Sequence, residues 1–164
     1  MNLHPVENYP LQKEIYPGFL KILMKVYVDA NIYITYLLGE KGEADAEIFF
    51  KKGIGCKFII VASKTTFAEI SMICGGRANI LLQKHIDDFK NAGKLEIVEK
   101  TLEDTQKAME LDLQSKNRYG INDFIHAILA KKHADILVTN DLKFLPTAAE
   151  IVKSSRLEKF ILEL

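Results

Sequence analysis

Cysteine is scarce in this chain, because only Cys56 and Cys74 occur among its 164 residues. The two form no C-x-x-C pair and have no histidine at zinc-site spacing, which excludes a structural zinc site built on cysteines. The sequence therefore does not resemble a disulfide-stabilised secreted domain, and we interpret both cysteines as buried free thiols in a reducing compartment.

The chain also lacks an excess of charge of either sign, since Lys+Arg and Asp+Glu count 22 each. No global basic field therefore points to a nucleic-acid partner, although the sum says nothing about a local basic face. No apolar run approaches the roughly 20 residues that a membrane-spanning helix needs, and the N-terminal residues lack the pattern of a signal peptide. These absences predict a cytoplasmic protein without a membrane partner.

Several catalytic signatures are missing as well. There is no P-loop G-x-x-x-x-G-K-[ST], no G-x-G-x-x-G after the first expected strand and no G-x-S-x-G nucleophile elbow. The stretch "VDANI" (28–32) shares only its aspartate with the opening motif of haloacid dehalogenases, because Asn31 stands where their second aspartate would be. These absences argue against NTP binding, dinucleotide binding, serine hydrolysis and phosphoaspartyl chemistry.

Length and pattern predict one domain preceded by an extension. Residues 1–23 hold three of the four prolines and show no period, so we expect an N-terminal extension at 1–23 and a single domain at 24–164. In the domain, short apolar runs alternate with helical patterns, which predicts an α/β fold: a three-layer α/β/α sandwich with a central parallel sheet. The expected strands are 25–32, 57–63, 94–100 and 135–139, the expected helices are 33–53 (broken at Gly39 and Gly42), 63–74, 77–93, 101–116, 121–134 and about 145–155, and 159–164 ("KFILEL") is a candidate edge strand.

Four acids from separate segments are expected at one edge of this sheet. Ligand sites of parallel α/β sheets lie beyond the carboxyl ends of the strands, where the pattern places Asp29, Glu69, Asp123 and Asp141. Asp135 precedes its strand and belongs to the opposite edge. Other polar residues of the helices are interpreted as solvated: Asp87, Asp88, Asp104, Asp112, His85 and His133.

Clustered carboxylates raise one another's pKa unless a cation lies among them. A hard divalent ion with oxygen ligands, Mg²⁺ or Mn²⁺, would remove that cost and would suit metal-assisted hydrolysis of a phosphodiester. Helix capping is the alternative role for Asp123 and Asp141, and a capping box with Thr66 is the alternative for Glu69. Ser63 is the better cap of that helix, which would leave Glu69 available. Asp29 is the hardest to explain by structure alone, because it follows a central strand.

The four segments together resemble the PIN-domain nucleases. "VYVDANI" is similar to the first motif of that family, "TTFAEI" to the second, and "INDFIHAILAKKHADILVTNDLKFL" to the third and fourth run together. The resemblance covers residues 25 to about 145. One departure is that a further acid often follows the last aspartate of the family, whereas Lys143 and Phe144 stand there in this chain.

This resemblance implies a Mg²⁺- or Mn²⁺-dependent ribonuclease in which Asp29, Glu69, Asp123 and Asp141 are catalytic and ligate the metal. Asn31 would fix Asp29, and Thr139 would be a polar accessory. It also implies an RNA substrate, a homodimer and, for the VapC-type toxins that form the largest group, an antitoxin protein as partner. The alternatives are a non-catalytic PIN-like module that binds RNA or protein, and a housekeeping RNA-processing nuclease.

Cationic and histidine side chains complete the expectation. Basic residues that could steer RNA are Lys116 with Arg118 and Lys131 with Lys132. His126 lies three residues after Asp123 on the same helical face, and we interpret it as a packing histidine, with a role beside the carboxylates as the alternative.

Overall fold

The structure is a computed structural model that describes residues 23–55 and 57–164. Five parallel strands form its central sheet. The expected extension 1–23 therefore lies outside the described residues except for its last position, as does Cys56. The strand order is β3-β2-β1-β4-β5, so β1 lies at the centre. The strands are β1 (Met24–Val28), β2 (Phe58–Ser63), β3 (Leu95–Val98), β4 (Ile136–Val138) and β5 (Ser154–Ser155), and each adjacent pair is parallel.

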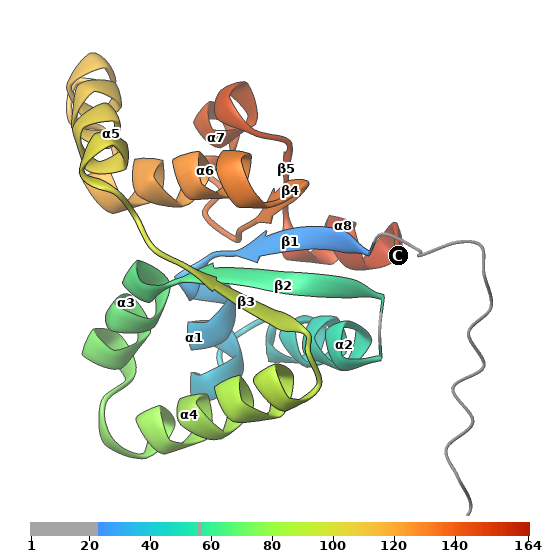
Figure 1. Ribbon diagram of the computed structural model, residues 1–164. Coiled ribbons are helices and arrows are strands. Elements are labelled where there is room, and N and C mark those ends of the chain that lie inside the picture. Colours follow the sequence, from blue (N-terminus) through green and yellow to red (C-terminus); the bar gives the residue numbers. More distant parts are fainter. Residues whose placement is uncertain (1–22, 56) are drawn as a thin grey trace, which may run out of the picture.

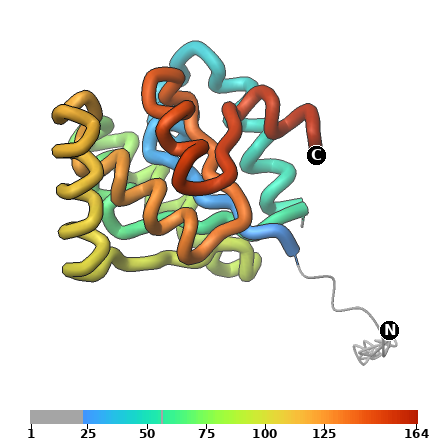
Figure 2. The backbone as a smooth tube through the Cα atoms, turned by 90° about the horizontal axis from the view of Figure 1, so that it is seen from above, coloured from blue at the N-terminus to red at the C-terminus, as the bar shows by residue number. Residues whose placement is uncertain are grey.

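Helices cover both faces of the sheet, which confirms the predicted three-layer sandwich (Figure 1). Figure 2 looks down on the layer of α5, α6 and α7, which lies across the sheet. Among the described residues, no helix is both long and apolar enough to cross a membrane. One layer contains α1 (Ala30–Leu38), α2 (Glu43–Ile54), α3 (Lys64–Cys74), α4 (Gly76–Asn91) and α8 (Leu157–Leu162); the other contains α5 (Leu102–Gln114), α6 (Ile121–His133) and α7 (Leu145–Ile151).

The three inner strands, β1, β2 and β4, are largely apolar because both of their faces are buried. In β1, Val26 and Val28 pack into the core beneath the sheet, whereas Tyr27 between them packs into the core formed with α5, α6 and α7. The side chains of a strand point alternately to its two faces, so each residue of β1 joins one core or the other. Tyr27 is fully buried although it carries a hydroxyl group, and a buried hydroxyl needs a hydrogen-bond partner.

The predicted edge strand at 159–164 was wrong. Most of that segment belongs to α8, and the edge strand is the shorter β5, which pairs with β4. Leu157 and Phe160, three residues apart, are both buried, and the Phe160 ring packs against Phe49 and Phe58. A helix places both side chains on one face, which a strand would not do.

The interpretation of Asp104 and Asp112 as solvated was also wrong, since their exposed fractions are 2% and 9%. Asp104 accepts hydrogen bonds from the backbone and hydroxyl group of Thr101, which caps α5, and forms an ion pair with Lys132 of α6. These partners lower the pKa of Asp104, although burial opposes them. Asp87 and Asp88 are exposed, as predicted.

Candidate active site

Asp29 stands at the carboxyl end of the central strand and is the N-cap residue of α1. Its side chain makes no capping hydrogen bond. Instead, Oδ2 accepts hydrogen bonds from Asn31 Nδ2 at 2.8 Å and from Thr139 Oγ1 at 2.6 Å. The carboxylate is therefore held toward the end of β4.

Thr139 joins the ends of β1 and β4. Its side chain is fully buried, and besides donating to Asp29 its hydroxyl oxygen accepts from Asn31 Nδ2 and from the Asp141 amide, each at 3.0 Å. Asn31 Oδ1 in turn accepts from the amide of Asn140 at 3.1 Å. One threonine hydroxyl thus fixes the positions of two of the predicted carboxylates, Asp29 directly and Asp141 through its backbone.

Asp123 and Asp141 are each oriented by nearby backbone amides. Asp123, in the first turn of α6, accepts through Oδ2 from the Gly120 amide at 2.9 Å. Asp141 accepts through Oδ1 from the amides of Lys143 at 2.9 Å and Phe144 at 3.0 Å, so it caps the turn that leads into α7. The second oxygens of Asp123 and Asp141, like Oδ1 of Asp29, accept no hydrogen bond within the described residues. The capping role predicted as an alternative therefore leaves part of each carboxylate unused.

Asp29 and Asp141 are close enough to Asp123 to affect the ionisation of its carboxyl group. Burial raises the pKa of the Asp123 carboxyl, and the negative charges of Asp29 and Asp141 raise it further. The Gly120 hydrogen bond and the nearby His126 act in the opposite direction without cancelling the effect. A bound cation would relieve this repulsion between the carboxylates.

Glu69 reaches the same edge from α3. Ser63 caps that helix, with Thr66 completing the capping box, so Glu69 is free of the capping role as predicted. Its Oε1 accepts from Asn122 Nδ2 at 2.6 Å, and its Oε2 lies 2.9 Å from His126 Nε2. Burial opposes ionisation, but the hydrogen bonds from His126 and Asn122 outweigh it and lower the pKa of Glu69.

All four predicted carboxylates therefore lie at the carboxyl edge, whereas Asp135 lies at the other edge and accepts from the Lys25 amide at 2.7 Å. Two polar partners of Glu69 were not assigned to it from the sequence: His126 was interpreted as a packing residue, with a role beside the carboxylates as the alternative, and Asn122 was given no role in the site. Their spacing offered a signal, because residues four apart on a helix share one face. Here that face binds Glu69.

The predicted basic residues divide between the two ends of α6. Lys116 and Arg118 are exposed in the loop just before it, at the end that carries Asp123. Lys131 and Lys132 lie in its last turn, and Lys132 is paired with Asp104. Lys131 and Lys132, predicted as candidates for steering RNA, therefore lie at the opposite end of α6 from Asp123.

Comparison with known proteins assigns the fold and the four motifs to one family. The family model for the PIN domain matches residues 26–150, which include every carboxylate described above. The chain belongs to the PIN-domain family. No curated protein matches it.

Two solved structures share the fold of this PIN domain. VapBC2 from Rickettsia felis, bound to a DNA fragment from the promoter, has a TM-score of 0.55 at 22% identity and covers 81% of this chain and 98% of its own. PAE2754 from Pyrobaculum aerophilum has a TM-score of 0.55 at 16% identity and covers 85% of this chain and 94% of its own. At these identities the likeness concerns the fold alone.

PIN domains are generally nucleases that use divalent metal ions. The side chains at this edge can be compared with the ligands that such an ion prefers. The donors are oxygens, as Mg²⁺ and Mn²⁺ prefer, and Asp29, Asp123 and Asp141 each keep one oxygen without a hydrogen bond. Across residues 23–55 and 57–164, no three His, Cys, Asp or Glu side chains already converge on one ion position. The donor chemistry therefore fits, and Asp29, Asp123 and Asp141 are all partly exposed.

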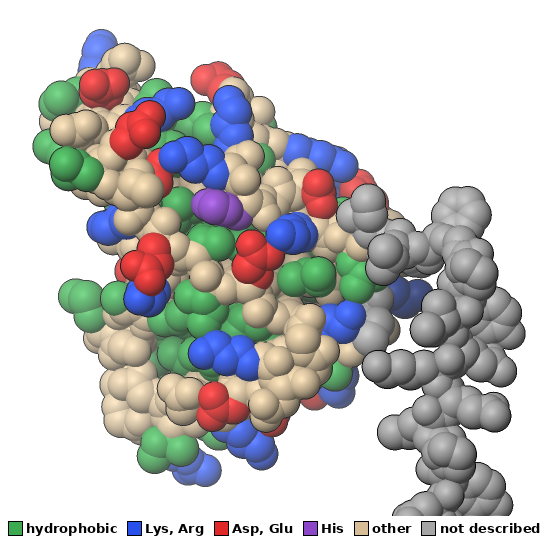
Figure 3. Space-filling view, viewed as in Figure 1, with side chains coloured by type: hydrophobic (Ala, Val, Ile, Leu, Met, Phe, Trp, Pro, Cys, Tyr) green, Lys and Arg blue, Asp and Glu red, His purple; other side chains and the backbone are tan. Residues whose placement is uncertain are grey.

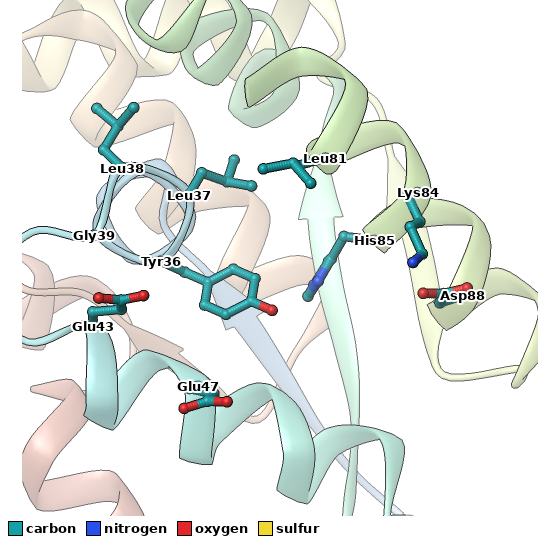
Figure 4. A pocket seen from close by; sticks show the side chains of 10 residues that line it. All are labelled: Tyr36, Leu37, Leu38, Gly39, Glu43, Glu47, Leu81, Lys84, His85 and Asp88. Carbon is teal, nitrogen blue, oxygen red and sulfur yellow. The ribbon is translucent and has the colours of Figure 1, made fainter. Parts of the chain in front are cut away.

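A hollow of about 610 Å³ lies elsewhere on the PIN domain, on the face of α1, α2 and α4 (Figure 4). Tyr36, Leu81 and His85 are among its lining residues, and none of the four site carboxylates is. His85, predicted to lie on the helix surface, instead packs against Phe50 and Phe89 at ring-centre distances of 4.4 and 4.6 Å. Its Nε2 is buried without a hydrogen-bond partner among the described residues.

The burial of His85 predicts acid sensitivity of the PIN domain. Burial lowers the pKa of His85 from 6.5 to about 4, although Asp88 opposes the shift. The unfolded chain therefore binds this proton first, and stability is lost as the pH falls from about 6.5 toward 4, by at most about 3 kcal/mol. In urea unfolding over this pH range, the free energy of unfolding should decrease less with falling pH in His85→Phe than in the wild type. His133→Gln, which changes a histidine outside the ring cluster, should keep the wild-type slope, and an equal slope for His85→Phe would contradict the assignment.

Proposed function

We propose that this PIN domain is a Mg²⁺- or Mn²⁺-dependent endoribonuclease that hydrolyses phosphodiester bonds in single-stranded RNA. The observation that supports it best is the group of three aspartates from the end of β1, from α6 and from the β4–α7 loop. Each has one carboxylate oxygen that accepts no hydrogen bond from residues 23–55 or 57–164. Such a set is costly in an ordinary fold, since Asp123 is both partly buried and repelled by the other two.

The residues of this site would have different roles. Asp29, Asp123 and Asp141, with Glu69 beside them, would hold an ion that neutralises charge on the scissile phosphate and activates a water. Thr139 and Asn31 keep Asp29 in place through the hydrogen bonds described above.

Local cations would guide the RNA to this edge. Lys116 and Arg118 are exposed in the loop before α6, and the charge of Lys100 is near enough to lower the pKa of Glu69. Elsewhere, Lys and Arg side chains are interspersed with Asp and Glu, as the face in Figure 3 shows. We therefore expect short-range contacts to a few phosphates rather than a strong long-range field.

The metal requirement provides the direct test. Purified protein is incubated with an unstructured RNA and the same sequence as DNA, with Mg²⁺, with Mn²⁺, and after chelation. We expect cleavage of the RNA only with a metal, leaving 5′-phosphate and 3′-hydroxyl ends, and none by an Asp29→Asn/Asp123→Asn double variant prepared in parallel. Cleavage that survives chelation or the double substitution would exclude this mechanism.

A toxin role is the favoured cellular context, because a solved structure that shares this fold is part of the VapBC2 complex. We propose an antitoxin protein as partner, a homodimer as the assembled form and the cytoplasm as the location. Expression of the protein alone should arrest growth, and a small gene just upstream should relieve the arrest. No arrest together with metal-dependent cleavage would indicate a housekeeping RNA-processing nuclease. Calorimetry that detects no Mn²⁺ binding dependent on Asp29 and Asp123 would indicate a non-catalytic module.

A further inference from the structure

A buried row of polar side chains leads from the centre of the sheet to Glu69. The Tyr27 hydroxyl group lies 3.0 Å from His126 Nδ1, and His126 Nε2 lies 2.9 Å from Glu69 Oε2. The exposed fraction is 0% for Tyr27 and 3% for His126. Three groups that are costly to bury thus come from three elements, β1, α6 and α3, and contact each other in sequence.

The row continues beneath Tyr27. Its hydroxyl group is 3.5 Å from Thr66 Oγ1, which is 3.0 Å from the Ser63 hydroxyl group at the end of β2. Ser63 and Thr66 are themselves fully buried. Tyr27 is therefore held on two sides, and its hydroxyl group has little freedom to leave His126.

The direction of the hydrogen bond to Glu69 is fixed by its partners. An ionised carboxylate only accepts, so His126 Nε2 must carry a hydrogen and donate it. With a neutral ring, Nδ1 accepts from the Tyr27 hydroxyl group; with a charged ring, Nδ1 donates to the Tyr27 oxygen, and that hydroxyl group can turn to Thr66. In both forms Nε2 donates to Glu69, so the arrangement does not depend on the charge of His126.

We propose that Tyr27 and His126 are positioning residues that hold the Glu69 carboxylate in the orientation needed for the metal. This inference rests on the proposed function, since it assigns the Tyr27–His126 pair a role toward the same ion. Each carboxylate oxygen has a second acceptor direction, so Glu69 can accept from His126 and Asn122 and still face the ion. Hydrogen bonds of this kind, made to a ligand from behind, set its orientation in metal sites.

Two substitutions at His126 separate positioning from packing. Glutamine can place its Nε2 donor near that of the imidazole, whereas methionine has a similar length but no donor. We expect His126→Met to lower the affinity for Mn²⁺ and kcat by about 10- to 100-fold, the usual effect of losing such a hydrogen bond. His126→Gln should recover most of both, and KM for RNA should change little in either variant.

Tyr27→Phe tests the inner half of the row with the removal of one oxygen atom. We expect an effect in the same direction as His126→Met but smaller, since His126 itself remains. Tyr33→Phe is the matched control, because Tyr33 is also buried but its hydroxyl group makes no hydrogen bond to the described residues. It should bind Mn²⁺ and cleave RNA like the wild type. If Tyr27→Phe and His126→Met also did so, the inference would be overturned.

A spectroscopic measurement separates this inference from the proposed function. In the metal-free protein, NMR should show a slowly exchanging imidazole N–H signal that is assigned to His126 by its absence from His126→Met. We expect this signal to shift and exchange faster in Tyr27→Phe but not in Tyr33→Phe. An unchanged signal in Tyr27→Phe overturns the positioning role even if the enzyme is active. If the wild type neither bound Mn²⁺ nor cleaved RNA, the proposed function would fail. A shifted signal in Tyr27→Phe would still show that Tyr27 positions His126 beside Glu69.

Discussion

Asp123→Asn is expected to abolish RNA cleavage and, at the same time, to make the protein more stable. The substitution removes a charge that is partly buried and repelled by Asp29 and Asp141, and the asparagine oxygen can still accept from the Gly120 amide. We expect activity to fall by at least about 100-fold, since loss of even an indirect contact to a metal site costs 10- to 100-fold. The free energy of unfolding should rise by about 0.5–2 kcal/mol, as for other stabilising replacements at functional sites.

The size of this gain in stability depends on pH. Because the pKa of Asp123 is raised in the folded protein, the wild type loses stability as the pH rises from the ordinary aspartate range through that higher pKa. The gain of Asp123→Asn should therefore appear in urea unfolding at neutral pH and vanish in acid, where the wild-type group is already neutral. Asp135→Asn, at the opposite edge, is the control and should leave cleavage unchanged. Loss of stability by Asp123→Asn at neutral pH would show that the carboxylates do not repel one another as described.

Thr139→Val should have the second largest effect, because it removes the hydroxyl group that connects the ends of β1 and β4. Valine has nearly the same shape, so packing is kept, but Asp29, Asn31 and the Asp141 amide each lose a partner. Leaving buried polar groups without partners costs about 1–3 kcal/mol. Since Asp29 is then no longer held, we expect cleavage to fall by about 10- to 100-fold as well.

Thr139→Ser is the matched control for this prediction, since serine keeps the hydroxyl group and loses only a methyl group. We expect its cleavage rate to stay within a few-fold of the wild type, with a small loss of stability. Denaturant unfolding and single-turnover cleavage measured on both variants distinguish the two roles of the side chain. If serine and valine had equal effects, the methyl contacts rather than the hydroxyl group would be responsible.

The sequence was sufficient to locate the four carboxylates because each is tied to a simple rule of the fold. Asp29 and Asp141 follow short, β-branched apolar runs that alternate with helical patterns, and the parallel pairing of β1 with β4 brings the carboxyl ends of these runs together. Glu69 and Asp123 lie in the early turns of helices that begin at that same edge. Local pattern and connectivity are enough for such placements, and no side-chain packing needs to be known.

The hydrogen bonds around these carboxylates could not be predicted in that way. The Tyr27–His126 contact joins residues 99 positions apart, and it depends on which face of α6 meets the sheet. The same limit applies to the ion pair of Asp104, because its partner Lys132 lies on another helix 28 positions away. The prediction of a strand for "KFILEL" was wrong for another reason: a run of six residues is too short for its hydrophobic period to distinguish a helix from a strand.

The contact between Asp29 and Thr139 spans 110 positions of the chain, from the first strand of the sheet to the end of the fourth. During synthesis, β1 leaves the ribosome long before β4, and a chain that stops short of residue 136 has Asp29 and Asn31 but lacks Thr139, the other hydrogen-bond donor to the Asp29 carboxylate. The group of carboxylates at the edge of the sheet can be completed only after β4 has joined the sheet. A truncated or still-growing copy of this nuclease is therefore expected to be harmless to the messenger from which it is being translated.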